Sequence, residues 1–247
     1  MQRILVLNAK GGCGKTTIAT NLAGYYASQG RVTALLDYDP QGSSMRWLSQ
    51  REQERPGIHG IAAYQKRRDV TRAFQMRLPT EAECVIVDAP AGVAGLQLAE
   101  YLQRVDTVVI PVLPSPIDIH AAAHFIQDLL LVGKARATGV RLGVVANRVR
   151  ENTLVFKDLE RFLSSLKLPL VATLRDSQNH IRAAEQGVGV HELDSHRTTK
   201  DLERWVPLIE WLDAGFVPAE QPEGGAVSVV GQGAFQPCPT RRDFTDL

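Results

Sequence analysis

The chain has 247 residues, 44% of them hydrophobic and 22% charged, and its formal net charge is +1. This composition is typical of one large globular α/β domain, and it provides no overall electrostatic case for nucleic acid, so any such case must be local. No apolar run approaches the ~20 residues that span a bilayer. Three cysteines without metal-ligand spacing favour a reducing cytoplasm, and a first strand that begins at once predicts no signal peptide.

A glycine-rich loop lies between a predicted strand at 3–7 and a predicted helix at 17–28. Strand, glycine loop and helix are the context that a phosphate-binding loop requires, because loop and helix N–H groups can surround an anion. We expect Lys15 to reach the outer phosphates and the Thr16 hydroxyl to bind Mg²⁺. The first glycine position of the usual motif holds Ala9. The predicted nucleotide-binding residues of the loop are Gly11, Gly12, Cys13, Gly14, Lys15, Thr16 and Thr17.

Two carboxylates, Asp37 and Asp39, follow the second predicted strand at 31–36. In isolation they would indicate an acidic turn, in which Pro40 ends the regular backbone structure. In a parallel sheet the carboxyl ends of adjacent strands face one crevice, so beside a phosphate loop a functional role is favoured. We expect Asp39 to orient a water molecule for attack on the γ-phosphate and Asp37 to support the Mg²⁺ shell.

Residues 44–80 carry weaker patterns. Residues 45–53 are predicted to be helical, and the basic cluster at 66–68 is interpreted as a solvated helix face, with partner binding as the alternative. The apolar strand that follows ends at Asp88, the pattern of a Walker B aspartate that binds the water shell of Mg²⁺. Gly92 is then placed to sense the γ-phosphate through its backbone N–H.

Strand and helix patterns alternate through the rest of the chain. This alternation predicts an α/β fold with a mostly parallel twisted sheet and helices on both faces, which together with the loop indicates a P-loop NTPase. Two tryptophans in the 201–211 stretch suggest either a membrane-bound helix or, in preference, packing on the sheet. Residues 214–247 are predicted to be a disordered tail after a domain at 1–213. The expected strands are 107–112, 140–146 and 169–173, and the expected helices are 117–131, 154–166, 180–186 and 198–211.

Three motifs, KGGCGKTT at 10–17, DYDPQGSS at 37–44 and VIVDAPAG at 85–92, together resemble the deviant Walker A ATPases of the ParA/MinD group. The resemblance covers roughly residues 1–213 and is strongest to the small ParA-like members. Its most specific element is Lys10, which in that group reaches across a homodimer interface to the partner's ATP. The resemblance therefore implies Lys10, Lys15 and Asp39 as catalytic residues, with ATP and Mg²⁺ as cofactors.

The resemblance also suggests where the base and a DNA partner would bind. Asn147 ends a strand where the group places an adenine contact. Arg175 stands near a second such contact, although the proline that usually precedes the arginine is absent. ParA proteins bind DNA without sequence preference through basic residues in the C-terminal half, and residues 134–182 hold ten Lys/Arg against four Asp/Glu. The candidate DNA contacts, with ordinary solvated charge as the alternative for each, are Arg148, Arg150, Arg175 and Arg182.

The leading hypothesis is a ParA-like positioning ATPase, cytoplasmic and associated with the nucleoid. It would form an ATP-dependent homodimer, bind DNA non-specifically and move a plasmid, a chromosome locus or a protein assembly, with hydrolysis stimulated by a cargo-linked activator protein. A MinD-like membrane switch is the first alternative, and the mixed charge of residues 240–247 argues against it. A metabolic ATP-dependent enzyme on the same fold is the second.

Overall fold

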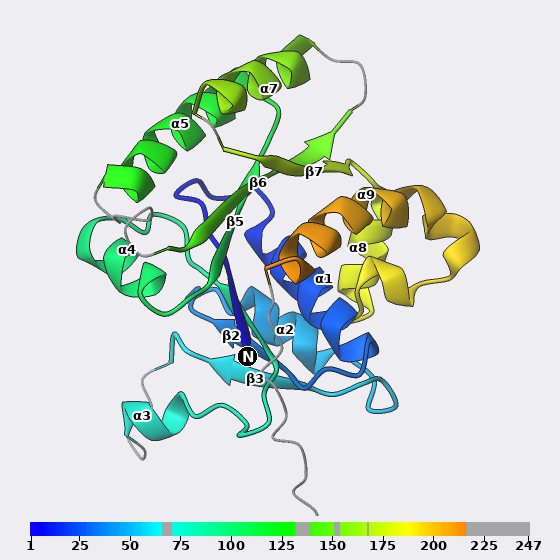
Figure 1. Ribbon diagram of the computed structural model, residues 1–247. Helices are drawn as coiled ribbons and strands as arrows, with labels where there is room; N and C mark the ends of the chain where they lie inside the picture. The colour runs from blue at the N-terminus through cyan, green and yellow to red at the C-terminus, as the bar shows by residue number, and fades with distance from the viewer. Residues whose placement is uncertain (66–70, 132–138, 151–153, 167, 216–247) are drawn as a thin grey trace, which may run out of the picture. The chain divides into compact units, whose positions relative to one another are not determined.

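A computed structural model of the chain describes residues 1–65, 71–131, 139–150, 154–166 and 168–215. Its centre is a seven-stranded sheet in the order β3-β2-β4-β1-β5-β6-β7, in which every neighbouring pair runs parallel (Figure 1). The sheet predicted from the alternating patterns is thus confirmed. The strands are β1 (Gln2–Val6), β2 (Thr33–Asp37), β3 (Ile58–Ala62), β4 (Cys84–Asp88), β5 (Thr107–Val112), β6 (Arg141–Val149) and β7 (Leu170–Arg175).

Helices cover both faces of the sheet. On one face lie α4 (Gly95–Leu102), α5 (Pro116–Leu131) and α7 (Leu154–Leu166). The other face carries α1 (Lys15–Ser28), α2 (Ser43–Ser49), the 3-10 turn η1 (Val190–Glu192) and α9 (Ser195–Asp213), with α8 (Gln178–Glu185) packed beside α9. The short helix α3 (Arg72–Gln75) follows β3.

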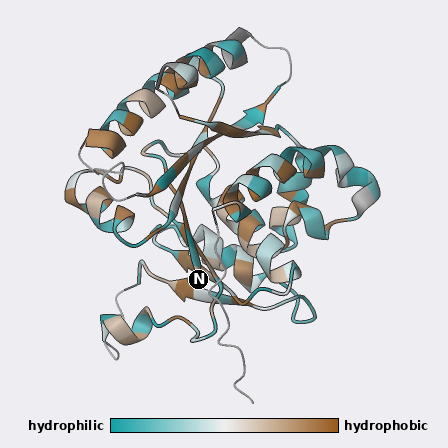
Figure 2. Cartoon of the chain, in the orientation of Figure 1, coloured by the Kyte–Doolittle hydropathy of each residue, from teal (hydrophilic) through white to brown (hydrophobic). Residues whose placement is uncertain are grey.

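Because both faces are covered, the central strands are continuous apolar runs and their side chains alternate between two cores. In β1, Ile4 and Val6 face the core beneath α1 and α9, and Leu5 faces the core beneath α4 and α5. All three are fully buried. Figure 2 shows the result as apolar strands in the middle of the domain with polar residues on the outer helix surfaces.

Several boundaries differ from the sequence predictions. The helix expected at 45–53 is α2, which begins at Ser43 and ends at Ser49, and the last helix begins at Ser195 and continues through Pro207. The strand β3 and the helix α4 were not anticipated. Trp205 projects from α9 and is buried in the core between this helix and the sheet. The interpretation that this helix packs on the sheet is therefore confirmed.

Two other predictions fall outside the described residues, namely the basic cluster at 66–68 and the tail from residue 216 onward. No helix in the described part of the chain is both long and apolar enough to cross a membrane.

The sheet places the predicted acidic residues at one edge. Asp37 and Asp88 are the last residues of the adjacent strands β2 and β4, and they lie directly opposite each other in the strand register. Val6, the end of β1, lies opposite Asp88 on the other side. The loop between β1 and α1 therefore starts beside both carboxylates, as the carboxyl-edge rule for parallel sheets predicts.

Candidate functional site

The loop between β1 and α1 is shaped by its glycines. Gly12 and Gly14 have φ values of 76° and 96°, a region that residues with a side chain rarely adopt. Gly14 is the N-cap of α1 and provides no side-chain hydrogen bond to it, so the N–H groups of the first turn are left for an anion. The buried Lys15 Nζ donates to the Lys10 carbonyl oxygen at 3.0 Å, which folds the lysine back over the loop.

Replacing Gly14 with alanine is expected to lower the free energy of unfolding by about 1–3 kcal/mol. The new Cβ would overlap the Asn147 Nδ2 atom in addition to occupying an unfavourable φ. Gly12→Ala is the matched control, because it carries the φ penalty but has open space around its Cβ. Urea unfolding of both variants measures the difference, and equal losses in the two would contradict the proposed clash.

Asp88 is a fully buried carboxylate beside the loop. Its Oδ2 accepts hydrogen bonds from Thr16 Oγ1 at 2.8 Å and Ser44 Oγ at 2.7 Å, and its Oδ1 is buried without a partner in the described structure. Burial raises the pKa of Asp88 to about 6, although both hydroxyl groups oppose the shift. An unpartnered carboxylate oxygen beside a threonine hydroxyl suits a hard cation that prefers oxygen ligands, so Thr16 and Asp88, two of the three predicted ligands, fit Mg²⁺.

Asp37 organises the segment that follows β2. Its Oδ1 accepts from the Asp39 N–H at 2.9 Å, and its Oδ2 accepts from the N–H groups of Ser44 and Met45 at 3.0 and 3.1 Å. Burial raises the pKa of Asp37, and these backbone hydrogen bonds oppose that rise. Both carboxylate oxygens are therefore used to fold the 37–45 segment, and Asp37 reaches Asp88 through Ser44.

Asp39 lies in that segment and is partly exposed. Its Oδ1 accepts the Gln41 N–H at 3.0 Å, which holds the carboxylate in a turn on the same edge of the sheet as the phosphate loop. Gly92 follows β4, and its N–H donates to the Ala9 carbonyl oxygen at 2.8 Å. The group expected to sense a γ-phosphate thus contacts the phosphate loop directly.

Lys10 is held by residues that the motifs did not single out. Its Nζ forms an ion pair with Asp118, which is hydrogen-bonded to Ser115 at the start of α5. Its backbone N–H donates at 3.1 Å to Asn8 Oδ1, and Asn8 in turn donates to the Pro111 carbonyl oxygen at 2.7 Å. The loop is therefore tied to β5 and α5 as well as to β4.

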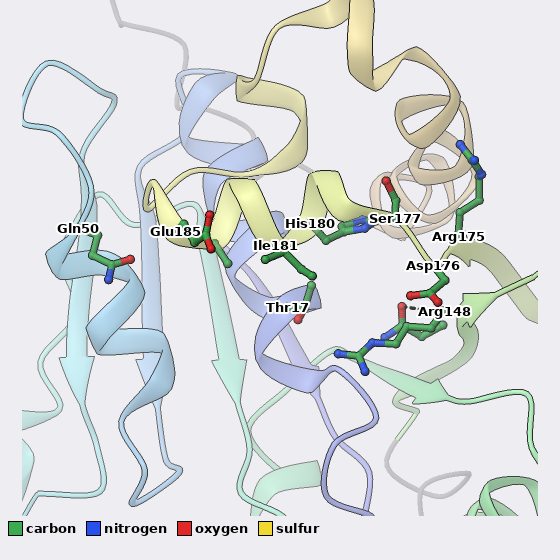
Figure 3. A pocket seen from close by; sticks show the side chains of 11 residues that line it. Thr17, Gln50, Arg148, Arg175, Asp176, Ser177, His180, Ile181 and Glu185 are labelled. Atoms are coloured by element: carbon green, nitrogen blue, oxygen red, sulfur yellow. Dashed lines mark hydrogen bonds between the residues drawn. The ribbon is translucent and has the colours of Figure 1, made fainter.

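A cavity of about 470 Å³ opens beside the phosphate loop (Figure 3). Asn147 and Arg175, the two predicted adenine contacts, both line it. The Asn147 amide donates at 2.8 Å to the Cys13 carbonyl oxygen, so the cavity wall and the loop share a hydrogen bond. Figure 3 shows Thr17 on α1 facing residues of α8 across this space. The remaining lining residues are Gln50, Arg148, Asp176, Ser177, His180, Ile181, Ala184 and Glu185.

The four candidate DNA contacts fall into two groups. Arg148 and Arg175 line the cavity, and Arg175 forms an ion pair at 3.4 Å with the buried Asp201. Arg148 is the only non-glycine residue with a positive φ, 52°, in the described part of the chain. Arg150 and Arg182 are exposed, and Arg150 lies 3.5 Å from Asp176 in a pair that is open to solvent.

Comparison with solved structures shows the same fold. The chain resembles the MinD cell division protein of Aquifex aeolicus with a TM-score of 0.66 and 17% identity, covering 90% of this chain and all of that one. It also resembles MinD from Pyrococcus horikoshii OT3, solved with Mg-ADP, with a TM-score of 0.59 and 15% identity over 86% of this chain and 96% of that one.

Sequence comparison identifies closer relatives. "Maintenance of carboxysome distribution protein A" of Halothiobacillus neapolitanus is 30% identical over 193 residues, 77% of this chain and 87% of that protein. The protein of the same name in Gloeobacter kilaueensis is 29% identical over 214 residues, 81% of this chain and 94% of that protein. Residues 4–190 match the family described as the CobQ/CobB/MinD/ParA nucleotide binding domain. The chain therefore belongs to the CobQ/CobB/MinD/ParA family of nucleotide-binding proteins, and within it the motifs around Lys10, Asp37 and Asp88 are those of the ParA/MinD ATPases.

Proposed function

We propose that this protein is a ParA-like positioning ATPase that dimerises with ATP, binds DNA non-specifically and distributes a cargo in the cell. The observation that carries the proposal is the 30% identity, over 87% of its length, to a protein named for carboxysome distribution. Those relatives favour a large protein assembly as the cargo over a plasmid or a chromosome locus. The protein would work in the cytoplasm on the nucleoid surface.

The phosphate loop would bind ATP by exchanging internal contacts for phosphate contacts. The Lys15 ammonium would leave the Lys10 carbonyl oxygen for the outer phosphates, with the N–H groups of the first turn of α1 beside them. Thr16 and Asp88 would hold Mg²⁺, which when bound neutralises charge on those phosphates. The cavity beside Asn147 would receive the nucleoside.

Hydrolysis requires a water molecule in line with the γ-phosphate. Asp39 is the carboxylate that we assign to orient this water, because it projects from the segment that Asp37 folds. The Ser44 hydroxyl connects the same segment to Asp88, so filling of the cation site and placement of Asp39 are coupled. A partner protein that stabilises this segment would stimulate a slow intrinsic rate.

Lys10 would supply the positive charge that completes the site of a second copy of the chain. A cation provided across an interface stabilises charge on the transferring phosphoryl group, and it makes dimerisation depend on the γ-phosphate. In the dimer the basic surfaces of the two copies would add, with Arg150 and Arg182 as exposed candidates for phosphate contacts on DNA. Arg148 and Arg175, which line the cavity, are weaker candidates for this role.

The proposal is tested by co-sedimentation with DNA and with anionic liposomes, each with ATP, with ADP and without nucleotide. We expect wild type to bind DNA with ATP alone, to lose binding as salt rises, and to lose it in Lys10→Ala. Arg77→Ala, which removes one exposed positive charge outside the loop, is the matched control. Nucleotide-dependent binding to liposomes without DNA binding would contradict the proposal in favour of a membrane switch.

A further inference from the structure

The ion pair between Lys10 and Asp118 joins the phosphate loop to the first turn of α5. The two side chains differ in exposure, with 34% of Lys10 and 10% of Asp118 accessible to solvent. Lys10 is thus the outer partner and Asp118 the inner one. An ion pair shielded on one side is screened less by salt than a fully exposed pair.

Asp118 is anchored, so it cannot follow Lys10 outward. The Ser115 hydroxyl donates to Asp118 Oδ2 and accepts the Asp118 N–H at 3.2 Å, a reciprocal pair at the start of α5. This leaves the buried Oδ1 for the Lys10 ammonium. The backbone of Lys10 is fixed as well, because its N–H donates to Asn8 and its carbonyl oxygen accepts from Lys15.

We propose that Asp118 is an autoinhibitory latch that holds Lys10 within its own protomer until the γ-phosphate of a partner's ATP competes for it. The inference rests on the proposed ATP-dependent dimer and identifies what opposes that dimer in the resting chain. A lysine that must reach a second copy has to leave its carboxylate first. The apparent affinity of the two copies for each other is therefore lower than the intrinsic affinity, in proportion to the fraction of chains in which Lys10 is free of Asp118.

The latch explains how dimerisation can distinguish ATP from ADP. Breaking the pair requires an anion that attracts the ammonium more strongly than Asp118 does. ATP carries a terminal γ-phosphate that can attract the ammonium in this way, and ADP lacks it. The release of Lys15 from the Lys10 carbonyl oxygen on phosphate binding loosens the same residue, so occupancy of a protomer's own site favours opening of its latch.

The first test measures the ATP concentration that gives half-maximal dimer by sedimentation velocity. Asp118→Asn keeps a hydrogen-bonding group for Ser115 but removes the charge, and we expect it to lower that concentration about tenfold. Asp128→Asn, an exposed carboxylate on the same helix, is the matched control and should behave as wild type. A weaker dimer in Asp118→Asn would overturn the latch, because it would show that Asp118 supports the active position of Lys10.

A second measurement does not depend on dimerisation. The rate at which an amine-reactive ester labels Lys10 in the nucleotide-free protein, followed by peptide mass spectrometry, reports how tightly the ammonium is held. We expect faster labelling in Asp118→Asn than in wild type or Asp128→Asn, and equal rates would overturn the latch. If wild type failed to dimerise with ATP, the proposed function would fall, and the labelling rates would still decide whether Asp118 restrains Lys10.

Discussion

Replacing Asp39 with alanine is expected to lower the rate constant of ATP hydrolysis about 10²- to 10⁴-fold while the ATP-dependent dimer still forms. The carboxylate is assigned to orient the attacking water, and among the described residues it forms its hydrogen bond within its own turn, to the Gln41 N–H, rather than with the phosphate loop. Removing it therefore leaves the groups that bind the nucleotide, Lys15, Thr16 and Asp88, in place. The variant should accumulate as an ATP-bound dimer that stays on DNA.

Single-turnover hydrolysis of ATP bound to the dimer separates this effect from a loss of affinity. Asp39→Asn is the informative companion, since it can still accept the Gln41 N–H but carries no charge. If the charge orients water, both variants are slow, whereas a fast Asp39→Asn and a slow Asp39→Ala would assign the residue to the turn alone. Normal turnover in both would show that another group positions the water.

The second large effect concerns Asp88. Asp88→Asn is expected to raise the free energy of unfolding of the nucleotide-free protein by about 1–3 kcal/mol at pH 7.5 and to abolish Mg²⁺-dependent ATP hydrolysis. Burial raises the pKa of Asp88 to about 6, above the ~3.9 of an unfolded chain, so at neutral pH the folded protein maintains a charge that its surroundings disfavour. Asparagine removes that charge and can still accept from Thr16 and Ser44.

The sign of the pH dependence follows from proton binding. Between the unfolded and folded pKa values the native state binds more protons at Asp88, so this group's contribution to stability is greatest at low pH. It is lost as the pH rises through the folded pKa of about 6, and it is constant only well above that value. The advantage of Asp88→Asn over wild type should therefore shrink between pH 7.5 and pH 5. Urea unfolding at both pH values, with the exposed Glu54→Gln as control, tests this, and an advantage that does not change with pH would contradict it.

The sequence was sufficient for the parts of the site that are local. The loop at 10–17, the end of β2 and the end of β4 each lie within a few consecutive residues, and a parallel sheet brings strand ends together by its topology. Thr16 therefore meets Asp88 as expected, while the Lys15 side chain contacts the carbonyl oxygen of Lys10. The role of Asp37 in the Mg²⁺ shell stays a prediction, and the structure shows that Asp37 folds the segment carrying Asp39.

Contacts that depend on long-range placement were not predicted. Ser44 lay inside a recognised motif, but only the side-by-side position of β2 and β4 brings its hydroxyl to Asp88. Asp118 is 108 positions from Lys10, and no periodicity in the chain indicates that α5 starts beside the phosphate loop. The edge strand β3 was missed because its central residues are exposed and include a glycine, so it lacks the apolar run that identified the buried strands.

The central claim is that Lys10 completes the site of the other copy in an ATP-bound dimer, and mixing two inactive variants tests it most directly. In a dimer of one Lys10→Ala and one Asp39→Ala chain, one of the two sites keeps both its own Asp39 and the partner's Lys10. An equimolar mixture should therefore recover up to about a quarter of wild-type ATPase activity, although each variant alone is inactive. If Lys10 served its own site, neither site of the mixed dimer would be intact, and a mixture no more active than the separate variants would contradict the account.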